Sequence, residues 1–223
     1  MIYILDDDAG KDFLHVKGDL YKYLVKVRRH SEGDELSFRS REDIKTLHKY
    51  RLQSVESRSV ELSLISSHVQ EVKSKKSLHV AWCVIDSKSI EKVLPSLCEI
   101  GVEKISFISC DRSQKNFKLD FKRFDRIVEA SMQQSGRSNY IEFDMYNKIK
   151  EFIEEFPNTK VFDFCDTTLQ NSSDFETVLI GCEGGFSADE KGLLSNLEVF
   201  RLNTPMILRS ESAVMAVASR ILL

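Results

Sequence analysis

The most constraining feature of this chain is an alternation, from residue 78 onward, of short apolar segments with amphipathic helical patterns. The segments that read as strands are LHVAWCVI at 78–85, KISFISC at 104–110, YIEF at 140–143, KVFDFC at 160–165 and TVLIG at 177–181. Helical patterns separate the first four of these segments, at 89–100, 119–136 and 147–156. Because two strands joined through a helix run in the same direction, the pattern predicts an α/β fold with a mostly parallel sheet.

The first part of the chain has a different pattern. Residues 1–68 hold short segments, several with period-two alternation, separated by polar turns such as HSEGD. Strands are expected at 2–5, 21–27, 35–38, 46–52 and 60–65. This pattern predicts a small β-barrel or sandwich. Residues 69–77, VQEVKSKKS, are polar and charged and suit a linker, so we expect two domains, 1–70 and 71–223.

Two strand-to-helix junctions near the C-terminus are the best candidates for a ligand site. VLIGCEGGFSADE at 178–190 is an apolar strand, a loop with three glycines, and a helix start at which Ser187 can cap and Glu190 can reach back. LNTPMILRSESA at 202–213 leads into the last helical pattern. Such loops lie at the carboxyl ends of the strands, where open α/β sheets bind their ligands.

The last helical pattern begins with Arg209, Ser210 and Glu211. Capping explains a hydroxyl at this place, and the helix dipole partly explains a carboxylate. A cation there opposes the dipole, so Arg209 needs a carbonyl or anionic ligand, or a paired carboxylate. The rest of this pattern, SAVMAVASRILL, is apolar on nearly all sides, which predicts burial by the fold together with a second subunit.

The glycine loop does not match the common phosphate-binding motifs. It lacks the GxGxxG spacing and the Lys-Ser or Lys-Thr pair of a P-loop, which disfavours a nicotinamide cofactor or a nucleoside triphosphate. A plain tight turn is the alternative interpretation. Cys182 has no histidine nearby in sequence to activate it as a nucleophile. All five histidines lie within the first 79 residues, so a proton acceptor in the last two thirds would be another group.

The cysteines are scattered, without a CxxC pair, which argues against a disulfide framework and a zinc site. We expect reduced and mostly buried thiols at 83, 98, 110, 165 and 182, and no metal.

No apolar run is long enough to span a membrane, and the N-terminus lacks the features of a signal peptide. The chain is therefore expected to be cytoplasmic.

The charge is unevenly distributed. A net charge of −3 argues against a uniformly basic nucleic-acid binder but leaves room for a local basic face. Cations are concentrated at 21–51 and at 112–126. Such runs are either solvated surfaces or contacts to RNA or DNA.

Four segments together carry a family resemblance. CEIGVEKISFISCDRS, MQQSGR, IGCEGGFSADE and MILRSESAVMAVASRI resemble the RsmE family, the small-subunit rRNA uridine-N3 methyltransferases of the SPOUT superfamily. The resemblance covers nearly the whole chain. It implies an α/β SPOUT methyltransferase domain with a C-terminal trefoil knot, preceded by a small PUA-like β-barrel domain that binds RNA. It also implies S-adenosylmethionine (SAM) as cofactor and a homodimer acting on small-subunit ribosomal RNA within the assembled subunit.

The resemblance also assigns the residues of the cofactor site. One loop would contribute Gly181, Glu183, Gly184 and Gly185, and the other Leu202, Ile207 and Leu208. Two departures from the family pattern affect these loops. Cys182 stands where the family usually has proline, and residues 203–206 replace a shorter segment that usually contains glycine and a basic residue.

Methylation of a uridine at N3 needs a proton acceptor and stabilisation of the negative charge on the flanking carbonyl oxygens. We expect Glu183 or Glu211 to accept or relay the proton and Arg209 to stabilise the uracil anion. The RNA contacts are expected from Arg28, Arg29, Arg112 and Arg137. Two alternatives stay open. The chain could be a non-catalytic RNA-binding assembly protein, or an enzyme that methylates another target, such as a ribose hydroxyl or a tRNA base.

Overall fold

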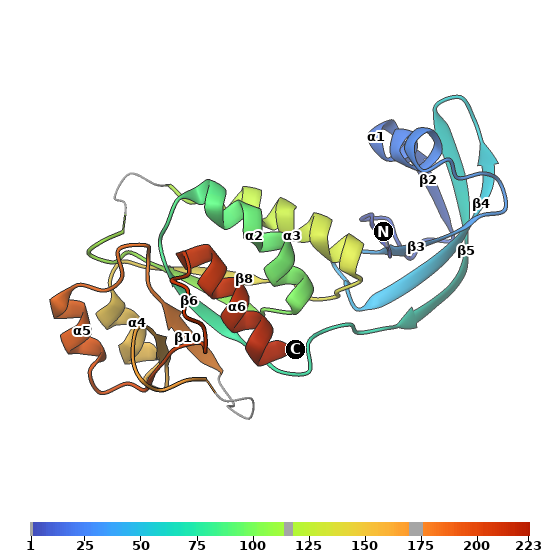
Figure 1. The fold of residues 1–223 in the computed structure, drawn as a ribbon. Coiled ribbons are helices and arrows are strands. Elements are labelled where there is room, and N and C mark those ends of the chain that lie inside the picture. Colours follow the sequence, from blue (N-terminus) through green and yellow to red (C-terminus); the bar gives the residue numbers. More distant parts are fainter. Residues whose placement is uncertain (1, 114–117, 170–175) are drawn as a thin grey trace. The chain divides into compact units, whose positions relative to one another are not determined.

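The computed structural model describes residues 2–113, 118–169 and 176–223. Figure 1 shows the ribbon. The chain forms two compact units, Met1–Lys73 with Met132–Asn139, and Ser74–Ser131 with Tyr140–Leu223. The first unit therefore includes a segment, 132–139, that the predicted boundary between residues 70 and 71 assigns to the second domain. No helix in the described ranges is long and apolar enough to cross a membrane.

The first unit is built on a five-stranded sheet of order β1-β3-β4-β5-β2. Its strands are β1 (Ile4–Leu5), β2 (Phe13–Lys17), β3 (Glu35–Arg39), β4 (Thr46–Val55) and β5 (Ser59–Val69). β1 pairs with β3 in parallel, and the other pairs are antiparallel. Burial alternates along β2, where Leu14 and Val16 point into a core that also holds Phe38, Tyr50 and Leu62. The sheet agrees with the all-β character predicted for this part of the chain.

The strand predicted at 21–27 is wrong. These residues form the end of α1 (Gly18–Tyr21) and a π-helical turn, η1 (Lys22–Val27). Tyr21 and Leu24 are buried, whereas Val27 is 67% exposed. The two buried positions are three residues apart, as on one face of a helix. The strand prediction arose because apolar and polar residues partly alternate along this segment. The prediction also missed β2.

The second unit contains a six-stranded sheet of order β11-β9-β10-β6-β7-β8, in which every pairing is parallel. Its strands are β6 (His79–Cys83), β7 (Lys104–Ile108), β8 (Glu142–Tyr146), β9 (Lys160–Phe162), β10 (Thr177–Ile180) and β11 (Val199–Phe200). The predicted α/β fold with a mostly parallel sheet is confirmed. β10 lies between β9 and β6, so the carboxyl ends of these three strands meet at the middle of one sheet edge.

Helices cover both faces of this sheet, with α2, α3 and α6 on one side and α4 and α5 on the other (Figure 1). They are α2 (Ser87–Ile100), α3 (Phe121–Ser135), α4 (Ile149–Glu155), α5 (Ala188–Leu194) and α6 (Ser210–Leu222). Asp86 caps α2, and Gly101 ends it with a φ of 104°, a left-handed conformation that favours glycine. Phe124 of α3 packs on Phe107 of β7, as the predicted apolar face requires.

Cys83 and Cys110 form a disulfide, so the prediction of reduced thiols is wrong for this pair. Cys83 ends β6 and is in register with Ile108 of β7, which brings Cys110, two residues further on, close to it. The two cysteines are 27 residues apart in sequence and belong to no spacing motif, so only the strand order reveals the pair. Cys98 and Cys182 are buried free cysteines, as predicted, and Cys165 is partly exposed.

Candidate active site

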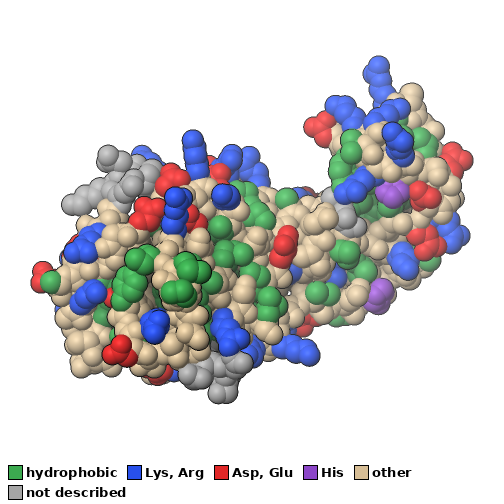
Figure 2. All heavy atoms as spheres, viewed as in Figure 1, with side chains coloured by type: hydrophobic (Ala, Val, Ile, Leu, Met, Phe, Trp, Pro, Cys, Tyr) green, Lys and Arg blue, Asp and Glu red, His purple; other side chains and the backbone are tan. Residues whose placement is uncertain are grey.

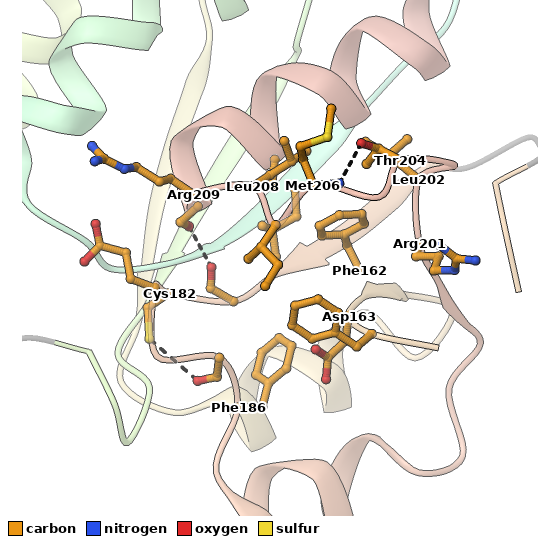
Figure 3. A pocket seen from close by; sticks show the side chains of 18 of the residues that line it. Phe162, Asp163, Cys182, Phe186, Arg201, Leu202, Thr204, Met206, Leu208 and Arg209 are labelled. Atoms are coloured by element: carbon orange, nitrogen blue, oxygen red, sulfur yellow. Dashed lines mark hydrogen bonds between the residues drawn. The ribbon is translucent and has the colours of Figure 1, made fainter. Parts of the chain in front are cut away.

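A cavity of about 800 Å³ opens at the carboxyl ends of β9 and β10 (Figure 3). Three segments line it, the end of β9, the glycine loop after β10, and the loop that joins β11 to α6. The lining residues are 162–164, 180–183, 185, 186, 201, 202, 204–210 and 213. The predicted pair of strand-to-helix loops therefore forms two walls of one cavity.

Large apolar side chains are exposed around this cavity. Phe164, Met206 and Ile207 are 75%, 67% and 81% exposed. In Figure 3, Asp163 and Phe186 lie on one side of the opening, and Met206 and Leu208 lie on the other. Exposed apolar groups around a concave surface with a few polar groups are typical of a small-molecule site.

The glycine loop is tied to the start of α5. Ser187 Oγ accepts a hydrogen bond from the backbone N–H of Glu190, and the Ser187 N–H donates to Glu190 Oε2. The predicted capping box is therefore confirmed. The second oxygen of Glu190 accepts from the Asp111 N–H at 2.8 Å. Gly185 has a φ of 66° and donates its N–H to the Cys182 carbonyl at 2.9 Å, so the loop turns through a conformation that suits glycine.

Arg112 holds the same loop from the other side. Its Nη1 donates to the Gly184 carbonyl at 2.7 Å. A Cβ on Gly184 would lie 3.2 Å from the Arg112 Cβ, so the absence of a side chain permits this close approach. Gly184 does not line the cavity, whereas Gly181, Glu183 and Gly185 do. Arg112, predicted to contact RNA, therefore also supports the loop.

Ser210 does not cap α6, and the prediction that it does is wrong. The N-cap is Arg209, which makes no side-chain capping bond, and Ser210 is the first helical residue. Its hydroxyl instead donates to the Gly181 carbonyl at 2.6 Å and accepts from Trp82 Nε1 at 2.8 Å. The start of α6 is thereby joined to the glycine loop.

The three predicted catalytic residues are divided between two cavities. Glu183 and Arg209 line the first cavity, and both are exposed. Arg209 also lines a second cavity of about 650 Å³, together with Glu211 and α2 and α6 residues that include Lys92, Val93, Met215 and Ala216. Among the described residues, the Arg209 side chain has no ion-pair or hydrogen-bond partner. The carboxylate pairing considered for Arg209 is not found within these ranges.

Glu211 has an unusual environment. Its Oε2 atom is buried, and no group in the described parts of the chain donates a hydrogen bond to it. Burial of an unpaired carboxylate oxygen is costly, and this oxygen belongs to a side chain that lines the second cavity.

Burial raises the pKa of the Cys182 thiol, which agrees with the expectation that Cys182 is not a nucleophile.

Sequence reasoning missed the wall formed by the end of β9. Phe162, Asp163 and Phe164 line the cavity, because β9 lies next to β10 in the sheet. Asp163 Oδ2 is 3.0 Å from Lys191 Nζ, and the Asp163 side chain is 16% exposed. In the sequence, Asp163 is only an acidic residue directly after an apolar segment. That position does not indicate a site residue until the order of the strands is known.

The other predicted RNA-binding residues belong to the first unit. Arg28 and Arg29 are exposed at the end of η1, where Arg28 Nε donates to the Tyr23 hydroxyl at 2.7 Å. Figure 2 shows Lys and Arg side chains gathered at the end of this unit that carries α1. Arg137, in contrast, is 5% exposed and donates from Nε to the Asn139 carbonyl. Its burial gives no support to a role in RNA binding.

Similar proteins share both the sequence and the fold. Residues 72–222 match the family model of the RNA methyltransferase domain. A Helicobacter pylori protein named ribosomal RNA small subunit methyltransferase E is 36% identical, and the match covers 98% of each chain. Ribosomal RNA small subunit methyltransferase E 2 of Borreliella burgdorferi is 25% identical, and the match covers 95% of this chain and 92% of the relative.

Two solved structures have the same fold. Ribosomal RNA small subunit methyltransferase E of Neisseria gonorrhoeae, bound to S-adenosyl methionine, superposes with a TM-score of 0.78 at 16% identity, covering 98% of this chain and 95% of the other. A Legionella pneumophila protein in complex with SAM also gives a TM-score of 0.78, at 20% identity, covering 99% and 95%. The sequence matches and the architecture agree, and the chain therefore belongs to the RNA methyltransferase family that includes the small-subunit ribosomal RNA methyltransferase E proteins.

Proposed function

We propose that this protein transfers the methyl group of SAM to N3 of a uridine in small-subunit ribosomal RNA. The observation that carries the proposal is the cavity built from the two loops predicted to hold the cofactor. Its volume of about 800 Å³ falls within the roughly 300–1,000 Å³ of small-molecule sites. The relatives named as small-subunit ribosomal RNA methyltransferases support the reaction class and the RNA substrate.

The residues around the cavity fit SAM. Phe162, Leu202 and Leu208 offer apolar surface for an adenine ring, and the backbone at Gly181 and Gly185 is accessible without intervening side chains. Asp163 supplies a carboxylate that can accept hydrogen bonds from ribose hydroxyls or from an ammonium group. The cofactor supplies an electrophilic methyl carbon on a positively charged sulfur.

We place the uracil in the second cavity. Arg209 lines both cavities, so a base held beside Arg209 would lie where the two sites adjoin. There the guanidinium can donate to a uracil carbonyl oxygen as negative charge develops on it. This role explains a cation at the N-terminus of α6, where the helix dipole opposes positive charge.

Glu211 is the better candidate for the proton acceptor. It lines the second cavity, and its buried Oε2 has no hydrogen-bond donor in the described ranges. In the proposed reaction Glu211 accepts the proton from N3, and the electron pair left on N3 bonds to the methyl carbon as the bond from that carbon to sulfur breaks. Glu183 is exposed and lines only the cofactor cavity, which makes it the second candidate.

No histidine competes for this role in the described part of the second unit. His79 is the only histidine in that unit, and it begins β6, at the sheet edge opposite the cavity. Burial lowers its pKa to about 4. The ring is therefore neutral at physiological pH and hydrogen-bonded to Ser106, which suits a structural role.

The remaining parts of the family assignment are also proposals. We infer a homodimer in which the partner subunit packs on α6 and encloses the second cavity proposed for the uracil, which Met215, Ala216 and Ser219 help to line. A trefoil knot is supported by the chain path, because β11 lies at the sheet edge outside β9 and α6 then begins beside the end of β10. We further propose that the first unit is a PUA-like RNA-binding barrel and that the protein is cytoplasmic, where its ribosomal substrate lies.

Nucleoside mapping of ribosomal RNA tests this function. RNA from a strain that lacks the gene should have lost one N3-methyluridine from the small subunit, and the wild-type gene should restore it. Restoration by Arg209→Ala would argue against the catalytic assignment. Unchanged small-subunit RNA together with loss of another methylated nucleoside would mean a different target, the second candidate enzyme function.

Cofactor binding separates an enzyme from an assembly protein. Isothermal titration with SAM should show saturable binding, and SAM should raise the melting temperature. A wild-type protein that neither binds SAM nor is stabilised by it would refute the enzyme proposal and favour a non-catalytic role in assembly.

A further inference from the structure

One buried hydroxyl connects the glycine loop to the last helix. Ser210 is 5% exposed and Trp82 is fully buried. Trp82 Nε1 lies 2.8 Å from Ser210 Oγ, and Ser210 Oγ lies 2.6 Å from the Gly181 carbonyl oxygen. Trp82 belongs to β6, Ser210 is the first residue of α6, and Gly181 directly follows β10, so the connection joins segments that are far apart in sequence.

The donor and acceptor groups fix the direction of the two hydrogen bonds between Trp82, Ser210 and Gly181. An indole N–H can only donate, and a backbone carbonyl can only accept. The Ser210 hydroxyl must therefore accept from Trp82 and direct its own hydrogen to Gly181. Trp82 orients this hydrogen, and each bond strengthens the other because the chain of donors is polarised in one direction.

We propose that Ser210 is a positioning residue that sets the cofactor loop relative to the catalytic residues. The inference rests on the proposed function of the cavity. Gly181 lines the cofactor cavity, and Ser210 holds its carbonyl. Arg209 and Glu211 are the chain neighbours of Ser210, so the same hydroxyl sets where both of them stand with respect to that loop.

The packing around Gly181 shows how a displacement of its carbonyl would reach the cofactor. An added Cβ on Gly181 would meet the Phe186 ring at 3.4 Å and the Gly185 Cα at 3.5 Å. Gly185 and Phe186 line the cavity themselves. A shift of the Gly181 peptide would therefore move the cavity wall, and a loss of the Ser210 bond should weaken cofactor binding.

The fluorescence of Trp82 can report on these hydrogen bonds. Trp82 is the only tryptophan in the chain, and it does not line the cofactor cavity. Binding of SAM can alter its fluorescence through the Ser210 bond, without direct contact to the indole. Occupation of the cavity should therefore change the emission of the wild-type protein, and the change should depend on the hydroxyl of residue 210.

The test compares Ser210→Ala with Ser131→Ala in the full-length protein. Ser131 is a matched control because it is also 5% exposed and its Oγ donates to the Pro95 carbonyl at 2.9 Å, between α3 and α2. Ser210→Ala leaves the Trp82 N–H buried without its acceptor, so we expect Kd and KM for SAM to rise at least about fivefold. Ser131→Ala should lose stability while its Kd and KM stay unchanged.

Two further variants make the test independent of folding defects. Ser210→Thr keeps the hydroxyl and should restore SAM binding and the fluorescence response. Trp82→Phe keeps a ring but removes the N–H, so it should weaken SAM binding less than Ser210→Ala. The effects of Trp82→Phe and Ser210→Ala should not add in the double variant. If Ser210→Ala does not fold, wild-type affinity in Trp82→Phe would overturn the proposal.

Other results would also overturn it. Wild-type Kd, KM and kcat in Ser210→Ala would do so, as would an equal loss of SAM affinity in Ser131→Ala, which would show an effect of stability alone. Failure of the wild-type protein to bind SAM would instead refute the proposed function. The two failures are therefore distinguishable.

Discussion

Gly185→Ala tests whether the cofactor loop depends on a left-handed backbone. Gly185 has a φ of 66° and lines the cavity. A Cβ added there would meet nothing within 4 Å, so the substitution causes no clash and its whole cost is conformational. An L-residue in the left-handed region costs about 1–2 kcal/mol. This cost can be observed in two ways, depending on whether the loop keeps its conformation.

A loop that keeps its conformation would lower the free energy of unfolding by about 1–2 kcal/mol. A loop that relaxes would bind SAM more weakly, by roughly 5- to 30-fold in Kd. Urea unfolding and isothermal titration measure these two quantities. Gly192→Ala is the control, because Gly192 lies within α5 and an added Cβ there also meets nothing within 4 Å. It should stabilise the protein by about 0.5–1 kcal/mol and leave Kd unchanged. Wild-type stability together with wild-type affinity in Gly185→Ala would refute the reasoning.

Three other predictions concern catalysis, RNA binding and pH. Arg209→Ala and Glu211→Gln should each lower the single-turnover methylation rate, by on the order of 10²-fold or more, with an unchanged Kd for SAM; near-normal rates at saturating SAM would contradict both roles. Arg28→Ala with Arg29→Ala should reduce the slope of log affinity for RNA against log salt by about 0.7–0.9 for each phosphate that is no longer neutralised, and an unchanged slope would exclude phosphate binding by these side chains. Because burial lowers the pKa of His79 from 6.5 to about 4, the unfolded chain takes up a proton there before the folded protein does; urea unfolding should show stability falling by at most about 3 kcal/mol between pH 6.5 and 4, and His79→Gln should reduce this dependence.

Sequence reasoning predicted the second unit well because its signals are local. The strands at β6, β7, β9 and β10 are short apolar runs, and the helices between them carry apolar faces at helical spacing. The capping box of Ser187 and Glu190 and the stop at Gly101 are also local, since each involves residues within one turn of a helix end. The same reasoning failed at 21–27, where the apolar residues fit both the two-residue period of a strand and the spacing of a helix. The burial of Tyr21 and Leu24, three residues apart, favours the helix.

The errors at the candidate site and at the disulfide have a common cause. Serine is a common helix-capping residue, but the hydrogen-bond partners of Ser210 are Trp82 and Gly181, which are remote in sequence. The disulfide partner of Cys83 is set by the register of two parallel strands. Asp163 faces the cavity because β9 lies beside β10. Each of these interactions depends on strand order, which no local pattern encodes.

The sequence by itself determined the α/β class, the two loops of the site and the family, because periodicity, glycine spacing and the motif around 207–213 are properties of neighbouring residues. Only the tertiary structure decided that the two loops line one cavity, that Arg209 adjoins a second cavity containing Glu211, and that one serine joins the glycine loop to the last helix. The physical reason is that hydrogen-bond partners and desolvation are set by what packs nearby. In a parallel sheet, neighbouring strands come from distant parts of the chain.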